Sequence, residues 1–351
     1  MQLLGPLDAL RRDAMAAVLA RPRLGAWITR RDARLVLVAT FGIVFALAVT
    51  CLVPAAALVL APIALGVPHV ASDARYLVLR RGLPADVVAL VVVGAASMLA
   101  LRVAEGVLDD PSRFASYELA LGGAWAGVLA FRAASVAGAW GRAVFVLAGL
   151  GALTSVALRA PDLARIVLAH GHNLVGVALW ALLFRRRRRP LVPIALALAA
   201  AVLFAGTGMP LRIAHALGTD HALGMSMDDA AAMLAPGLAT ASAGASVLVA
   251  SYVLLQGVHY AVWLGWIPQD DLRGEGTLTF GMTVRGLVRD FRPLGLVAIG
   301  LTWVVVVVGA LFSARGARDT YLSLASFHAY VELAVLAYFL VAGMRRSRAR
   351  A

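Results

Sequence analysis

The segment PAAALVLAPIALGVPHVASDARY, residues 54–76, has no Asp, Glu, Lys or Arg in its first nineteen residues and places His69, Asp73 and Arg75 in its last eight. An apolar run of this length is typical of a helix that crosses a lipid bilayer. Ionisable side chains inside such a helix are costly and usually face the interior of a helical bundle. We therefore expect residues 54–76 to span a membrane and to carry a functional group.

The composition extends this expectation to the whole chain. Of the 351 residues, 62% are apolar and 15% are charged, and the apolar residues fall into blocks of about 20, the length that spans a bilayer core. A β-barrel would instead show alternating segments of about ten residues. The predicted fold class is all-α, a polytopic transmembrane helical bundle.

Hydropathy and charge together predict the topology. Ten spans are expected, at residues 35–52, 55–79, 84–105, 114–134, 139–158, 162–184, 190–206, 238–266, 294–313 and 320–343. Arginines gather in every second connection, for example at residues 185–189, whereas residues 207–237 contain only Arg212. Because cytoplasmic loops carry the excess of basic residues, both the N- and the C-terminus are predicted to be cytoplasmic.

The remaining parts of the chain flank one membrane domain. Residues 1–34 are expected to form a basic amphipathic segment at the membrane surface, residues 35–344 a single transmembrane domain, and residues 345–351 a basic cytoplasmic tail. The formal net charge of +13 is assigned to topology and to contact with membrane lipids, not to nucleic acid. We expect the protein in the inner membrane of a bacterium.

Five of the seven histidines lie within predicted spans. They are His69 in the second span, His170 and His172 in the sixth, His259 in the eighth and His328 in the tenth. All four helices run from outside to inside in this topology, so the rise of 1.5 Å per residue puts these histidines in about the middle half of the membrane. His170 and His172 point in nearly opposite directions, and only one of them is expected to face the centre.

Two of the histidines have a carboxylate on the same helix face. Asp73 follows His69 by four residues, and Glu332 follows His328 by four, a spacing that makes side chains neighbours. A carboxylate that accepts an imidazole N–H orients the ring of a metal ligand. Asp73 and Glu332 are therefore predicted to orient the rings or to bind the metal themselves, while Glu118 is a further acid near the outer end of its span.

These residues suggest a metal site formed by His69, His259, His328 and either His172 or His170. Cys51 is the single cysteine, so a cluster of thiolates is excluded, and Fe(II) fits the imidazole and carboxylate donors best, with Zn or Cu as alternatives. Such a site with an open position would bind O₂ beside a hydrophobic substrate, as an oxygenase does. Trp266, seven residues after His259, is expected in the interfacial aromatic belt.

Two other functions account for buried histidines. In a proton-coupled transporter, the His–Asp and His–Glu pairs would relay protons. In an electron carrier, histidines on two helices would bind a b-type haem.

The residues around His69 also resemble a known family. Gly66, Pro68, His69 and Asp73 match the Gly-x-Pro-His-Gly-x-x-Asp type of motif of the Brp/Blh family of membrane β-carotene 15,15′-dioxygenases, with Val70 in place of the second glycine. This resemblance implies a multi-helix membrane protein in which histidines hold one iron ion. It also implies cleavage of the central double bond of a carotenoid, or action on a related isoprenoid.

Overall fold

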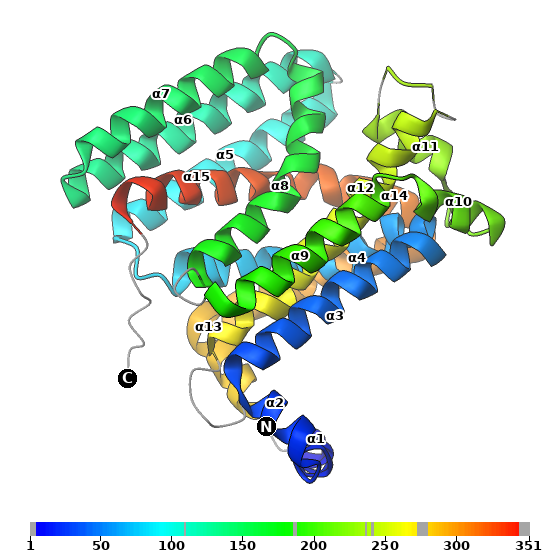
Figure 1. Ribbon diagram of the computed structural model, residues 1–351. Helices are drawn as coiled ribbons and strands as arrows, with labels where there is room; N and C mark the ends of the chain where they lie inside the picture. Colours follow the sequence, from blue (N-terminus) through cyan, green and yellow to red (C-terminus); the bar gives the residue numbers. More distant parts are fainter. Residues whose placement is uncertain are drawn as a thin grey trace.

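The computed structural model describes residues 5–108, 110–184, 188–235, 237–239, 242–271 and 280–343. These residues are almost entirely helical, which confirms the all-α fold class (Figure 1). The α-helices are α1 (Gly5–Leu19), α2 (Pro22–Thr29), α3 (Arg31–Leu52), α4 (Pro54–Asp73), α5 (Ala85–Leu108), α6 (Pro111–Ala137), α7 (Trp140–Ala157), α8 (Pro161–Phe184), α9 (Arg188–Ala205), α10 (Met209–Ala216), α11 (Met227–Leu234), α12 (Ala243–Ala261), α13 (Phe280–Phe312), α14 (Ala314–Ala325) and α15 (Phe327–Ala342). Two π-helices, η2 (Ala74–Leu79) and η3 (Val262–Trp266), a 3-10 helix, η4 (Ile267–Asp271), and two short strands, β1 (His221–Ala222) and β2 (Met225–Ser226), complete the fold.

The helices account for all ten predicted spans. Within the described residues, nine helical stretches are long and apolar enough to cross a membrane. The tenth is a bent pair, Pro190–Ala205 and Met209–Ala216, whose axes differ by 62°. Gly208, with a φ of +70°, lies at the bend, a backbone conformation that glycine adopts without strain. The short seventh span of the sequence is therefore half of a broken span.

Contacts between helix ends agree with the predicted alternation of the spans. Arg132 on α6 pairs with Asp86 at the beginning of α5. Arg165 at the beginning of α8 pairs with Glu105 near the end of α5, with an N–O distance of 2.8 Å. In each case, the helix ends that meet are those that the predicted topology places on one side of the membrane. The assignment of one side to the cytoplasm stays a prediction.

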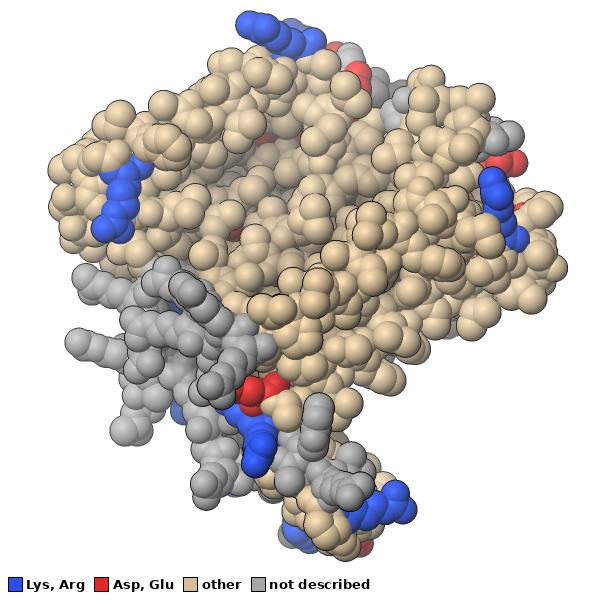
Figure 2. All heavy atoms as spheres, viewed as in Figure 1, with Lys and Arg blue, Asp and Glu red and all other residues tan. Residues whose placement is uncertain are grey.

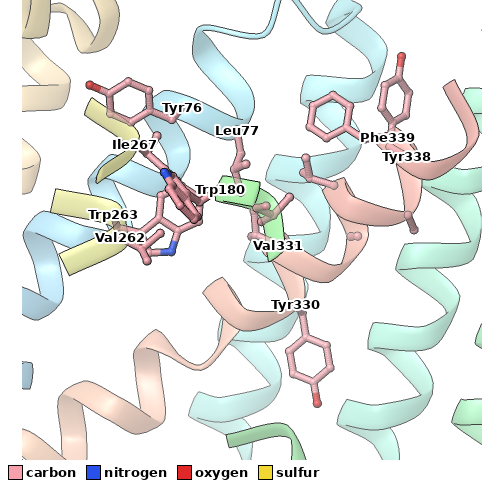
Figure 3. Close-up of a cluster of buried hydrophobic side chains, with 14 of the residues drawn as sticks. Tyr76, Leu77, Trp180, Val262, Trp263, Ile267, Tyr330, Val331, Tyr338 and Phe339 are labelled. Atoms are coloured by element: carbon pink, nitrogen blue, oxygen red, sulfur yellow. The ribbon is translucent and has the colours of Figure 1, made fainter. Parts of the chain in front are cut away.

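The centre of the bundle is formed by α12 and by α14–α15. Two thirds of the residues in the hydrophobic windows of these segments are buried, whereas none are in α13. Figure 3 shows Trp180, Trp263 and Val262 packed together on one side of this core. Leu77 and Val331 lie between that group and the aromatic residues of α15.

The outer surface is apolar, as expected for helices that contact lipid. Figure 2 shows one face covered by uncharged side chains, with the arginines at its margins. Phe145 on α7 and Phe312 on α13 are more than 80% exposed. Large apolar side chains are rarely this exposed over whole helices of a soluble protein, so the structure is that of an integral membrane protein.

The N-terminal segment forms two short helices before the first span. α1 and α2 occupy residues that were expected to lie at the membrane surface, and α3 begins at Arg31, four residues earlier than the predicted span. The carboxylate of Asp8 on α1 accepts a hydrogen bond of 2.6 Å from the backbone N–H of Phe280 at the beginning of α13. α13 itself is broken at Arg292, which has a φ of +60° and precedes Pro293. Only the part after this break corresponds to the predicted ninth span.

The long connection before α12 contains a small hairpin. β1 and β2 pair across Leu223 and Gly224, which both have a positive φ, as a tight two-residue turn requires. Ser226 then caps α11, and its hydroxyl and backbone N–H both donate to the carboxylate of Asp229. These hydrogen bonds hold the pKa of Asp229 below its usual value. The predicted basic tail, residues 345–351, lies outside the described residues.

Candidate metal centre

Four of the five histidines predicted within the membrane converge at one point of the bundle. The ring centroid of His69 on α4 lies 4.8 Å from that of His328 on α15 and 5.3 Å from that of His259 on α12. The ring of His172 on α8 lies 5.1 Å from His259 and 5.3 Å from His328. His69, His259 and His328 are each more than 90% buried. The centre is thus formed by α4, α8, α12 and α15, the four helices expected from the sequence.

Backbone hydrogen bonds fix the orientation of three of these rings. The Nδ1 atom of His172 lies 2.9 Å from the carbonyl oxygen of Ala169, and that of His328 lies 2.5 Å from the carbonyl oxygen of Ala325. The Nδ1 atom of His69 lies 3.3 Å from the carbonyl oxygen of Leu65. In all three rings the carbonyl belongs to a residue three or four positions earlier in the same helix. A carbonyl oxygen only accepts hydrogen bonds, so Nδ1 carries the hydrogen and Nε2 of the neutral ring keeps its lone pair.

Two of the resulting lone pairs face each other. The Nε2 atoms of His69 and His328 lie 3.3 Å apart. Two nitrogens that bind one ion at about 2.1 Å in a tetrahedral arrangement lie about 3.4 Å apart. Ligand atoms of His69, His259 and His328 all lie within 4.8 Å of one another. The donor set and its spacing therefore fit a single metal ion.

The two predicted carboxylates are present, but they are placed differently from the expectation. Glu332 was expected to orient His328 on its own helix. Its Oε1 atom instead accepts a hydrogen bond of 2.9 Å from the indole N–H of Trp263 and lies 3.8 Å from Nε2 of His259. Asp73 does not bond to His69, whose Nδ1 faces Leu65, and neither carboxylate oxygen of Asp73 has a hydrogen-bond partner among the described residues. Backbone carbonyls thus orient the histidine rings, a role that the sequence predicted for the two carboxylates.

Several polar atoms at this centre have no hydrogen-bond partner within the described part of the chain. They are both ring nitrogens of His259, both carboxylate oxygens of Asp73 and Oε2 of Glu332. Buried polar atoms in proteins are nearly always paired, and exceptions call for an unseen ion, water or functional role. These atoms, contributed by three neighbouring helices, are available to an ion or to water.

The local backbone brings these side chains into position. Each of the helices α4 and α12 changes to a π-helix within one to two turns after its histidine, at Ala74 and Val262, and π-turns are frequent at functional sites. Gly176 on α8 also contributes to this arrangement. A Cβ atom there would lie 3.0 Å from Nε1 of Trp263 and 3.2 Å from Nδ1 of His259. The absence of a side chain lets α8 approach the centre closely.

Sequence analysis did not identify Trp263 and Tyr260 as site residues. The ring of Tyr260 lies 4.8 Å from that of His69. Trp263 is fully buried, as is Trp266, so the interfacial position predicted for Trp266 is wrong. The signal was available in the spacing, because Trp263 follows His259 by four residues and shares its helix face.

A cavity of about 370 Å³ leads from the histidines toward the end of the bundle at which α8 begins. Arg102, Arg165 and Glu118 line its far part. Glu118 accepts hydrogen bonds of 2.7 Å from Arg102 and 2.6 Å from Arg165, and Glu105 contacts both arginines. Glu118 was identified from the sequence as an acid near the outer end of its span, but the two arginines that pair with it were not identified. Volumes of this size are typical of small-molecule sites.

The other three histidines lie elsewhere. His170 turns away from the centre, since its Nε2 lies 3.1 Å from the carbonyl oxygen of Leu234. The alternative left open for α8 is therefore settled geometrically in favour of His172. The side chains of His215 and His221, in the connection before α12, are 82% and 70% exposed. Both contact Asp220, and the hydrogen bond from His215 is the main cause of the lowered pKa of that carboxyl.

Comparison of the chain with models of protein families, with curated proteins and with solved structures gives no match.

Proposed function

We propose that the protein is a membrane-embedded oxygenase that holds one metal ion, iron in the first place, between histidines and acts on a hydrophobic substrate such as a carotenoid or another isoprenoid. The observation that carries this proposal is the pair of Nε2 lone pairs, on His69 and His328, that face each other at 3.3 Å. Neither atom has a hydrogen to donate while Nδ1 is bonded to a carbonyl. A cation between them removes the repulsion of the two lone pairs.

The residues of the chain have distinct roles in this proposal. His69, His259 and His328 would hold the ion, and His172 stands next to them as a fourth donor. Glu332 would offset the positive charge from beside His259, held in place by the indole N–H of Trp263. Iron(II) in a site of imidazoles with an open position supplies activation of O₂. Oxidative cleavage of a carbon–carbon double bond into two carbonyl products consumes both oxygen atoms of O₂ and needs no further reductant.

The surroundings favour a dry reaction on a greasy molecule. The histidines lie in the core of the bundle, and Tyr252, Tyr260 and Leu322 line the cavity beside them, whose far part is lined by charged residues. Exclusion of water strengthens the interactions of charges in the site and protects reactive species from side reactions.

The same 3.3 Å contact favours one other function. A single proton shared between the two Nε2 atoms would also join His69 and His328, and histidines that exchange protons occur in proton-coupled transporters. The two functions differ in what they require: a metal ion in the first case and none in the second.

Elemental analysis of the purified protein separates these two proposals. We expect about one iron per chain, and we expect His259→Ala to lose most of it. His170→Ala is the matched control, because His170 also lies within a membrane span but bonds to the carbonyl of Leu234 and not to the centre. The metal proposal would be wrong if the wild type held less than about one metal ion per several chains and if His259→Ala and His170→Ala had the same metal content. The shared proton would then be favoured. A Soret band in the visible spectrum would instead identify a haem.

A further inference from the structure

A second and larger groove lies between α13 and the helices of the candidate metal centre. Its volume is about 1020 Å³. One wall is α13, and the opposite wall is formed by α4, η2, η3 and η4. Val67, Pro68 and Ala71 of α4 line this groove, whereas His69 lines the cavity of the metal centre. α4 therefore separates two different spaces.

The end of the groove near the beginning of α13 is strongly basic. The described residues that line the groove include no carboxylate and five arginines: Arg11, Arg75, Arg80, Arg285 and Arg289. Asp290 stands just behind them and lies 2.8 Å from Arg75 and 3.4 Å from both Arg80 and Arg289. Asp290 thus contacts three of the five arginines, and the carboxylate of Asp8 lies at the same end of the groove, where it accepts a hydrogen bond from the backbone N–H of Phe280. Arg285 has no acidic partner among the residues that the structure describes.

The other end of the groove is apolar. Leu296, Ile299 and Trp303 of α13 face Val67 of α4 across it. The ten-residue rise from 293 to 303 corresponds to about 15 Å of helix, half of a hydrocarbon core of about 30 Å. The apolar part is therefore about as long as one leaflet is deep, and the basic part lies where that leaflet has its headgroups.

We propose that this groove binds one anionic phospholipid of the leaflet on the basic side, with its phosphate among the arginines and an acyl chain along α13. Arginine binds phosphate oxygens through paired N–H donors, and basic pockets between transmembrane helices are known to select anionic headgroups. The arginines that line the groove favour an anionic headgroup. The apolar continuation explains why a lipid, and not a soluble phosphate, is the ligand.

Native mass spectrometry of the full chain, titrated with dioleoyl phosphatidylglycerol or dioleoyl phosphatidylcholine, tests the proposal. We expect the wild type to retain one phosphatidylglycerol with at least tenfold preference over phosphatidylcholine. The double variant Arg285→Gln/Arg289→Gln removes two arginines of the groove, and each contributes about fivefold to the affinity for an anionic lipid. We therefore expect about twenty-fivefold weaker binding of phosphatidylglycerol.

Two further variants make the test specific. Arg132→Gln/Arg142→Gln removes the same charge at the same end of the bundle but outside the groove, and should bind like the wild type. Gly300→Phe adds a side chain in the apolar part of the groove, where a Cβ atom meets nothing within 4 Å. This variant should weaken the binding of phosphatidylglycerol without any change in the charge of the protein.

Equal retention of the two lipids by the wild type would overturn the proposal. So would equal losses in the two double variants, because the arginines would then act only through the total charge of the protein. If the Arg285/Arg289 variant does not fold, the wild-type preference and the Gly300→Phe result decide alone. Phosphatidylglycerol binding unchanged in Gly300→Phe would also contradict the placement of the acyl chain. None of these outcomes depends on the metal content, so the lipid site and the proposed oxygenase fail separately.

Discussion

The hydrogen bond between Trp263 and Glu332 offers a quantitative test of how the candidate metal centre is held. In Trp263→Phe the ring remains apolar and aromatic, but the N–H that donates to Oε1 of Glu332 at 2.9 Å is lost. Glu332 is completely buried, and its Oε2 atom has no other partner in the described residues. The variant therefore leaves a buried carboxyl group without a protein donor.

Trp180→Phe is the matched control for this change. Trp180 is 3% exposed, Trp263 is fully buried, and both belong to the same hydrophobic core. The indole N–H of Trp180 has no hydrogen-bond partner in the part of the chain that the structure describes. Both variants lose a similar volume of packed indole, so their difference isolates the hydrogen bond to Glu332.

The expected difference follows from ordinary magnitudes. A hydrogen bond to a charged group contributes about 1.5–3 kcal/mol. With an entropy of unfolding of about 2.1 cal/mol/K per residue, the 351-residue chain has about 0.7 kcal/mol/K, so this loss lowers the Tm by about 2–4 °C. A partner that orients a group beside a metal ligand also contributes about 10–100-fold to metal affinity. Trp263→Phe should show both losses relative to Trp180→Phe.

Thermal unfolding in detergent gives the Tm, and a chelator titration followed by elemental analysis gives the relative metal affinity. Equal Tm values and equal metal retention in the two variants would refute the reasoning, because the indole N–H of Trp263 would then have no effect on the centre. A lower Tm with unchanged metal affinity would restrict its role to stability.

Two further predictions concern the motif around His69 and the hairpin region. A Cβ atom at Gly66 would lie 2.4 Å from the ring of Tyr321, so Gly66→Ala should destabilise the protein by about 1–3 kcal/mol through overpacking, while Gly149→Ala, where a Cβ meets nothing within 4 Å, should be neutral or stabilising by thermal unfolding. Because the pKa of Asp229 is lowered in the folded state, its contribution to stability is present above the unfolded pKa of about 3.9 and is lost as the pH falls through the lowered folded value. Ser226→Ala should move this pKa up toward its ordinary value, which NMR titration of the carboxyl group measures; an unchanged pKa would contradict the assigned hydrogen bonds.

Much of the fold could be predicted from hydropathy because the bilayer fixes the length of each span and demands that its backbone be helical. The breaks were harder to predict, for the reason that they depend on single residues inside apolar runs. Gly208 bends the seventh span, and Arg292, which precedes Pro293, interrupts α13. The residue before a proline disfavours the helical conformation, so the second break was readable in principle.

The candidate site was predictable to the level of helices, but not to the level of contacts. A histidine at membrane depth stands out in any sequence, and this identified α4, α8, α12 and α15. Spacing alone did not decide between His170 and His172, since opposite faces of α8 both contact protein. Glu332 does not pair with His328 as predicted, because His328 bonds to the carbonyl of Ala325 and Glu332 accepts a hydrogen bond from the indole of Trp263. Helical periodicity reveals neither of these partners.

The free energy cost of burying unpaired polar atoms indicates that this centre serves a function and not only helix packing. Five polar atoms of His259, Asp73 and Glu332 have no hydrogen-bond partner among the described residues. An unsatisfied buried polar atom costs about 1–3 kcal/mol, so five together would cost about 5–15 kcal/mol, as much as the entire stability of a typical protein. Such an arrangement calls for partners for these atoms, either water molecules or the proposed metal ion. The proposed metal ion, bound by Nε2 of His259, would pair that nitrogen and offset the charge of Glu332 beside it, whereas Nδ1 of His259 and the carboxylate of Asp73 would still need partners of their own.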